Sequence, residues 1–153
     1  RVVRRGKDVS LVAFSYSVVE AFEAGKILSD QGIECDILDI YSLNPIDWSA
    51  IFRSVRKTGR IIVFDISHPV ASISSEVIAK VTLNCQSNLK SVPDRITKPD
   101  VPEPTGYKLT KQYYPSIEQI VNRVLKMFGK KSLKGIHQIT HHDIPGPWFE
   151  GPF

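Results

Sequence analysis

The sequence predicts an α/β fold with three layers, α/β/α, in which helices cover both faces of a mostly parallel sheet of about five strands. Residues 9–14 form a short, nearly continuous apolar run, which is typical of a strand buried on both faces. In residues 18–28 the apolar side chains recur at helical spacing, with charged side chains between them. Residues 33–40 supply a second apolar strand. Together the three segments predict a βαβ unit with parallel strands and a right-handed crossover.

The chain has 153 residues, of which 42% are hydrophobic and 24% charged, and this suffices for one domain with its own core. Residues 1–6 read Arg-Val-Val-Arg-Arg-Gly, without an initiator Met. They are interpreted as a basic, linker-like approach to the first strand, in a piece excised from a longer polypeptide. Further along, Gly32 stands where a helix C-terminus favours a residue tolerant of positive φ.

A turn is predicted at Asn44-Pro45, and Asp47 is expected to cap a short helix that begins at Trp48. The apolar side chains of that helix share one face. Basic residues in its last turn and Gly59 after it predict its end. The third strand is predicted over residues 61–65.

The next helix is predicted over residues 73–83, where apolar side chains again fit one face. Residues 89–97 are predicted as a fourth short strand that Pro93 interrupts, and it is therefore expected at an edge of the sheet. Three prolines in residues 98–106 predict an ordered, extended loop. The final helix is expected to start after Ser116 as its N-cap and to end at Gly129, with a wide apolar stripe packed on the sheet.

Composition changes after Gly129, and this divides the chain into a domain of residues 1–129 and an extended C-terminal arm of residues 130–153. The arm is basic at first and then rich in His, Pro and aromatic residues, with little helical or strand periodicity. A disordered tail would carry fewer large apolar groups. The arm is therefore expected to dock on its own domain, a sister subunit or another partner, with Trp148 and Phe149 buried in that contact.

Charge and cysteine content argue against several classes of function. The formal net charge of +4 is modest, and no aromatic-interleaved basic patch accompanies it, so nucleic-acid binding is not expected. No run of the sequence is long and apolar enough to span a bilayer, and no membrane partner is expected. Cys35 and Cys85 are interpreted as buried free thiols in a reducing compartment, the cytoplasm or, in a eukaryote, the mitochondrial matrix.

The candidate site residues lie at a strand end, where open parallel sheets carry their binding sites. Asp65 and His68 could form an acid–base pair, but no nucleophile accompanies them, so a local hydrogen bond of His68 is favoured and both residues are expected to contact a partner. His137, His141 and His142 have spacings that could ligate zinc in a helix, yet the Pro-rich run that follows favours a surface cluster. Four acidic residues are expected at ordinary solvated positions: Asp36, Asp39, Glu20 and Glu23.

Several blocks of the sequence resemble a known family. They include Gly32-Ile-Glu-Cys-Asp-Ile-Leu-Asp, Ser54-Val-Arg-Lys-Thr-Gly-Arg-Ile-Ile-Val and Arg95-Ile-Thr-Lys-Pro-Asp-Val-Pro-Glu-Pro. Together they resemble the C-terminal domain of transketolase-like enzymes, over Arg1 to about Phe128. The last block is similar in particular to the beta subunit of the decarboxylating component of 2-oxo acid dehydrogenase complexes, the pyruvate and branched-chain enzymes.

The resemblance implies an enzyme that uses thiamine diphosphate with Mg²⁺ to decarboxylate a 2-oxo acid, but it places the cofactor between other domains. It therefore implies no catalytic, cofactor-binding or metal-binding residue in this chain. The implied role is an assembly domain that supports pairing with a sister beta subunit or homo-oligomer, with the alpha subunit and the dihydrolipoyl acyltransferase core as further partners. Two alternatives are a stand-alone interaction or regulatory module and, more weakly, a small α/β enzyme in its own right.

The sequence also departs from the family pattern at strand-end loops. Ser15 stands where a Gly is common, Tyr41 follows the second strand where an Arg is usual, and Ile66 follows Asp65 where a Glu-containing pair is usual. Residues 72–75, Ser-Ile-Ser-Ser, replace an expected glycine pair. Because partner contacts are made at such loops, these changes bear on activity and assembly more than on the fold.

Overall fold

The fold is taken from a computed structural model, which describes residues 1–106, 109–110 and 113–136. Within these residues strands and helices alternate along most of the chain, as the sequence predicts. In chain order the elements are β1 (Val2–Arg4), β2 (Val9–Ala13), α1 (Ser17–Asp30), β3 (Cys35–Asp39), α2 (Trp48–Thr58), β4 (Ile61–Phe64), α3 (Ile73–Cys85), the 3₁₀ turn η1 (Gln86–Asn88), β5 (Asp94–Ile96) and α5 (Ile117–Met127).

The sheet has the strand order β1-β3-β2-β4-β5. The four strands from β2 to β5 are parallel, and β1 alone runs antiparallel, against β3. Leu11 at the centre of β2 is in register with Ile37 on one side and Ile62 on the other. The chain thus crosses from β2 to β3 in one direction and returns past β2 to reach β4. This reversal leaves a switch point beside the end of β2.

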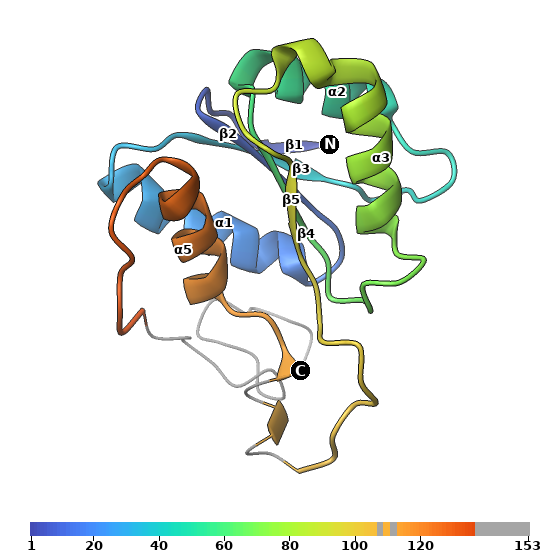
Figure 1. The fold of residues 1–153 in the computed structure, drawn as a ribbon, viewed down its shortest axis with the longest axis vertical. Helices are drawn as coiled ribbons and strands as arrows, with labels where there is room; N and C mark the ends of the chain where they lie inside the picture. The colour runs from blue at the N-terminus through green and yellow to red at the C-terminus, as the bar shows by residue number, and fades with distance from the viewer. Residues whose placement is uncertain (107–108, 111–112, 137–153) are drawn as a thin grey trace, which may run out of the picture.

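Helices cover both faces of the sheet, α1 and α5 on one face and α2 and α3 on the other (Figure 1). Two clusters of buried side chains follow from this layering. One joins alternate residues of the strands to α1 and α5, and the other joins the remaining strand residues to α2 and α3. Both faces of β2 and β4 are buried, which explains why β4 is wholly apolar and β2 is apolar except for Ser10. The three-layer fold with a mostly parallel five-stranded sheet is confirmed.

Caps confirm the predicted starts of α2 and α5 and the predicted end of α2, whereas α3 runs two residues beyond its predicted end, to Cys85. An oxygen of Asp47 accepts a hydrogen bond from the Ala50 N–H at 3.0 Å, and Ser116 caps α5 by accepting from the Gln119 N–H. Gly59 ends α2 with a left-handed backbone, φ 73°. Gly32 likewise has φ 75° after α1.

Two predictions about the strands need correction. Residues 2–4 are not a linker: they form β1, whose backbone pairs with β3 and closes one edge of the sheet. Residues 89–97 form a strand only over Asp94–Ile96, after the η1 turn, because Pro93 lacks the N–H that a longer strand would need. The expected edge position of β5 is confirmed.

Within the described part of the chain, none of the helices combines the length and apolar character needed to cross a membrane.

Candidate functional site

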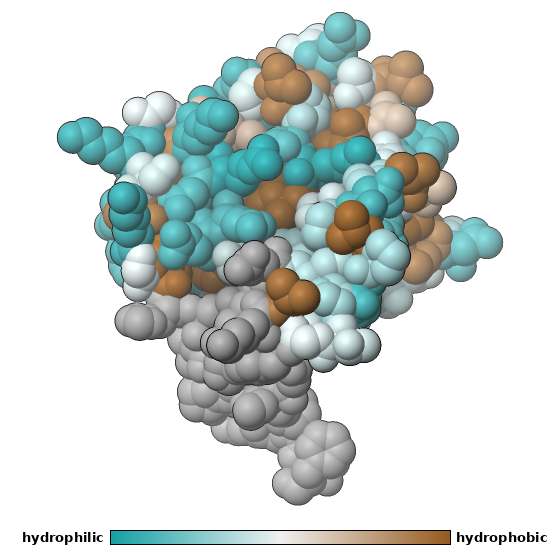
Figure 2. Space-filling view, turned by 60° about the horizontal axis from the view of Figure 1, so that its bottom comes forward, coloured by the Kyte–Doolittle hydropathy of each residue, from teal (hydrophilic) through white to brown (hydrophobic). Residues whose placement is uncertain are grey.

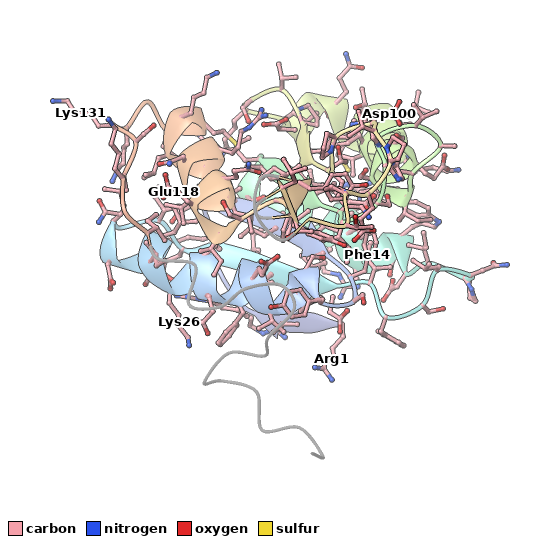
Figure 3. All side chains as sticks on the ribbon, turned by 90° about the horizontal axis from the view of Figure 1, so that it is seen from below. Arg1, Phe14, Lys26, Asp100, Glu118 and Lys131 are labelled. Carbon is pink, nitrogen blue, oxygen red and sulfur yellow. The ribbon has the colours of Figure 1, made fainter. Side chains whose placement is uncertain are left out.

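The loops that follow β2, β3 and β4 meet at one end of the parallel sheet, which we call the strand-end face. Open α/β sheets bind their ligands here, beside the switch point. Figure 3 looks onto this face, with Phe14 after β2, Arg1 just before β1, and Asp100 in the loop after β5.

Asp65 follows β4 at this face but is fully buried. One carboxylate oxygen accepts the Ser67 N–H at 2.7 Å, and the other accepts the Ser74 N–H at 3.2 Å in the first turn of α3. A carboxylate at a helix N-terminus is favoured by the helix dipole. Asp65 therefore fixes the loop between β4 and α3 from inside, and its carboxylate is not presented to a partner.

His68 lies in the same loop and is exposed. Its Nδ1 is 3.8 Å from a carboxylate oxygen of Asp100, which is itself exposed. An ion pair this open to solvent contributes little to stability. The structure therefore places His68 beside Asp100 and not beside Asp65, at a distance too long for the expected local hydrogen bond. The expected partner contact of His68 stays a prediction.

The loop after β2 has an unusual backbone. Ser15 has φ 57°, in the left-handed region that favours glycine, at the position where the resembled family commonly has Gly. The next turn is fixed by Ser17, whose Oγ accepts the Phe14 N–H and lies 2.6 Å from the Phe14 carbonyl and 3.1 Å from that of Phe64. Ser17 thus ties the ends of β2 and β4 together at the switch point.

Glu20 in α1 is a buried carboxyl group, so the expectation of a solvated position is wrong. It is 4% exposed, and its Oε2 has no hydrogen-bond partner among the described residues. Burial raises the pKa of Glu20 to about 8, so the group is largely protonated at neutral pH. One signal was available: Glu20 stands one turn before Ala24, on the apolar stripe of the helix.

Asp36 is also buried, contrary to expectation, and anchors α2 to the sheet. Its two oxygens meet Lys57 Nζ at 2.7 Å and the Ser54 hydroxyl at 2.5 Å, and it also accepts the Gly6 N–H at 3.0 Å. The Ser54 hydroxyl also forms a hydrogen bond of 2.7 Å with the hydroxyl of Ser10 in β2. Burial disfavours the ionised carboxylate, yet these hydrogen bonds and the Lys57 charge together hold the pKa of Asp36 below its usual value.

Several large apolar side chains are exposed in the loops of the strand-end face. Tyr41 after β3 is 77% exposed and Val70 after β4 is 71% exposed, and Leu43 and Val101 are exposed as well. Figure 2 turns the lower end of Figure 1 toward the viewer and shows apolar side chains at separate points among hydrophilic ones. Separate exposed apolar side chains are normal on a protein surface, so these residues mark a surface for association only if one partner covers them together.

Other residues singled out in the sequence are the two cysteines and the aromatic and histidine residues of the arm. Cys35 and Cys85 are buried and free, as expected, and burial raises the pKa of Cys35 to about 12, so this thiol is unreactive. The described residues contain no group of three or more His, Cys, Asp or Glu side chains that could hold a metal ion. Trp148, Phe149 and the histidines of the arm lie outside the described residues.

Comparisons of sequence and of structure with known proteins point to the same family. The model of the family "Transketolase, C-terminal domain" matches residues 1–120. The acetoin:2,6-dichlorophenolindophenol oxidoreductase subunit beta of Bacillus subtilis (strain 168) is 39% identical over 132 residues, which are 86% of this chain and 39% of the relative. The mitochondrial pyruvate dehydrogenase E1 component subunit beta-1 of Arabidopsis thaliana is 35% identical over 121 residues, or 79% of this chain and 33% of the relative.

Among solved structures, the inactive beta4 tetramer of a split-gene transketolase superimposes with a TM-score of 0.69 at 28% identity, covering 86% of this chain and 41% of that one. The matched part of the chain thus covers between 33% and 41% of the length of these three proteins.

Proposed function

Because the chain belongs to the transketolase C-terminal domain family, we propose that it is the C-terminal assembly domain of the beta subunit of a thiamine-diphosphate-dependent 2-oxo acid dehydrogenase. In this role it carries out no chemistry itself. It supports pairing of two beta subunits and docking to the alpha subunit and the dihydrolipoyl acyltransferase core. The names of the relatives, all beta subunits of oxidoreductases or dehydrogenases, support the parent enzyme.

The described residues do not fit the cofactor of such an enzyme. Mg²⁺ bound to a diphosphate needs several oxygen ligands, usually including carboxylates. The buried carboxylates of Asp36 and Asp65 are instead occupied by hydrogen bonds within the chain. This supports our proposal that thiamine diphosphate and Mg²⁺ bind to other domains of the parent enzyme.

The observation that carries the assembly role is the exposed apolar set of the strand-end face. Tyr41 and Val70 come from the loops after β3 and β4, the two strands that flank β2, and both are exposed within the described chain. Burying them against a partner would stabilise an interface, whereas their exposure in a lone domain favours aggregation. We therefore assign the subunit contact to this face.

The test is the solution mass of residues 1–153, measured by light scattering at about 50 µM, where moderate self-association is populated. We expect a dimer, and we expect the double variant Tyr41→Asp with Val70→Asp to have the mass of a monomer. Leu83→Asp is the matched control, since Leu83 is 81% exposed but lies near the far end of α3. The control should remain a dimer.

A monomeric wild-type chain at all concentrations would refute pairing through this domain alone and would favour the stand-alone interaction module. An equal loss of mass in the Leu83→Asp variant would place the contact elsewhere. For docking, the acyltransferase core should retain the wild-type chain in a pull-down, and failure to do so would remove that part of the proposal.

A further inference from the structure

A second surface of the molecule has features of a binding site. A cavity of about 1050 Å³ runs between α5, β5 and the segments that follow each of them. In Figure 1 these elements lie side by side on the α5 side of the sheet, at the β5 edge. We call this cavity the β5–α5 groove. Its volume is at the upper end of the range for small-molecule pockets.

The charges that line the β5–α5 groove are mostly of one sign. Among its described lining residues Glu118 is the one carboxylate, against five cationic side chains: Arg95, Lys98, Arg123, Lys126 and Lys130. These cations are far apart in the sequence: Arg95 and Lys98 lie in and after β5, and the other three lie in α5 and just after it. The fold brings them to one surface.

The cations differ in how strongly the chain itself uses them. Arg95 donates to the Pro69 carbonyl at 2.7 Å and holds the loop before α3. Lys98 lies 5.2 Å from the Tyr113 ring centre and 3.9 Å from a carboxylate oxygen of Glu103. Arg123 pairs with Asp94 at 3.1 Å. These interactions build the walls of the groove.

Lys126 and Lys130 form no ion pair within the described chain. Both are exposed, and neither has a carboxylate oxygen within the 4.0 Å of an ion pair in the described chain, although Lys130 donates to the Gln31 carbonyl. Lys126 stands three residues after Arg123 on α5, and like charges at this helical spacing repel one another and cost stability. A surface that collects such charges is complementary to an anionic partner.

We propose that the β5–α5 groove binds an acidic segment of a partner protein. A peptide is favoured over a nucleic acid because the lining interleaves prolines and Ile136 with the cations, which suits alternating acidic and apolar side chains. Single-stranded nucleic acids are instead held by exposed aromatic rings that stack on bases. Tyr113, the aromatic residue among the described lining, is only 4% exposed.

This inference is independent of the proposed assembly role, because the β5–α5 groove and the exposed apolar loops share none of their defining residues. It would hold for a stand-alone module as well as for a subunit of a larger enzyme.

The test measures fluorescence anisotropy of a labelled peptide of about 12 residues, in which Glu alternates with Ala, added to the full chain at about 50 mM salt. We expect binding that the same peptide with Gln for Glu does not show. Lys126→Glu combined with Lys130→Glu should weaken binding by about tenfold or more. Lys7→Glu combined with Arg53→Glu makes the same change in net charge outside the groove and should alter affinity by less than about twofold.

Circular dichroism of each variant shows that it is folded. No binding of the Glu peptide, or an equal loss in the two double variants, would overturn the proposal. A thymidine oligonucleotide of matching charge, or inorganic triphosphate, that competes as well as the peptide would also overturn it, because the groove would then be an unspecific anion site.

Discussion

Glu20 shows how a single residue couples the fold to pH. Its pKa is raised by burial from 4.5 to about 8, so between these values the folded chain holds a proton that the unfolded chain has released. The contribution of this group to stability is fully present below about pH 4.5 and decreases by about 1.4 kcal/mol for each pH unit up to about 8. The carboxyl group is therefore tolerated in the interior as a neutral acid.

The variant Glu20→Gln, which is uncharged at every pH, should lose this dependence. Its free energy of unfolding, measured with urea, should rise relative to the wild type by about 3 to 4 kcal/mol between pH 5 and pH 8. Glu23→Gln, on the same helix but paired at the surface with Lys26 at 2.7 Å, should keep the wild-type slope. Parallel curves for Glu20→Gln and the wild type would contradict the buried, neutral state of Glu20.

Ala71 has a backbone that suits glycine better, with φ 51° in the loop before α3. Replacing it by Gly relieves the contact between Cβ and the carbonyl oxygen, at a smaller cost in backbone entropy. We expect Ala71→Gly to raise the free energy of unfolding by about 0.5 kcal/mol. Ala79→Gly, at an exposed position inside α3, should lower it by about 1 kcal/mol. Thermal unfolding of both variants measures the difference, and a loss of stability in both would argue against strain at Ala71.

At the scale of elements, Asp36 determines how α2 lies on β2 and β3. Asp36→Ala would remove an acceptor from the Ser54 hydroxyl and the Gly6 N–H and leave Lys57 unpaired, and it should cost about 3 kcal/mol. Asp39→Ala is the matched control on the same strand, because the hydrogen bonds described for Asp39 use its backbone. It should cost less than about 1 kcal/mol.

Urea unfolding at neutral pH distinguishes the two variants of β3. The deficit of Asp36→Ala should shrink in acid, because the lowered pKa of Asp36 means that its stabilising effect is lost as the pH falls through the folded-state value. Equal costs for the two variants would show that the buried network does not hold α2 in place.

The elements differ in how far sequence could predict them. The parallel strands and their helices were accessible because buried strands are continuously apolar and because Asp47, Ser116 and Gly59 are strong boundary signals. The role of Asp36 was not, since a strand buried on both faces shows no alternation that would separate a buried Asp36 from a half-buried Asp39. Strand β1 was missed because three residues are too few for a pattern.

For the whole molecule, sequence indicates the fold and the family but not the surfaces. The β5–α5 groove joins residues near position 95 to residues near position 126, and only the strand order of the completed sheet brings them together. The exposed loops of Tyr41 and Val70 likewise lie at the same end of the sheet only because β3 and β4 run parallel on either side of β2. Candidate sites built from residues near in sequence, such as Asp65 with His68, were separated by the local geometry of the loop.

The arm carries the remaining prediction at this scale, that Trp148 and Phe149 are buried in a contact. The variant Trp48→Phe leaves Trp148 as the one tryptophan, and Phe keeps an aromatic ring stacked on Phe52. Acrylamide should quench Trp148 about threefold less in the native chain than in urea, because a contact shields the indole. Equal quenching in the two conditions would show that the arm leaves Trp148 in solvent.

The direction of β1 has a practical consequence for measurements of the solution mass. Because β1 runs antiparallel to β3, it brings Arg1 to the end of that strand, where the Arg1 carbonyl accepts the Asp39 N–H at 2.8 Å. Arg1 therefore lies opposite Asp39, two residues before Tyr41 in the chain, at the strand-end face. An affinity tag or fluorophore fused to Arg1 would emerge onto that face, and it should be cleaved off before any mass is measured.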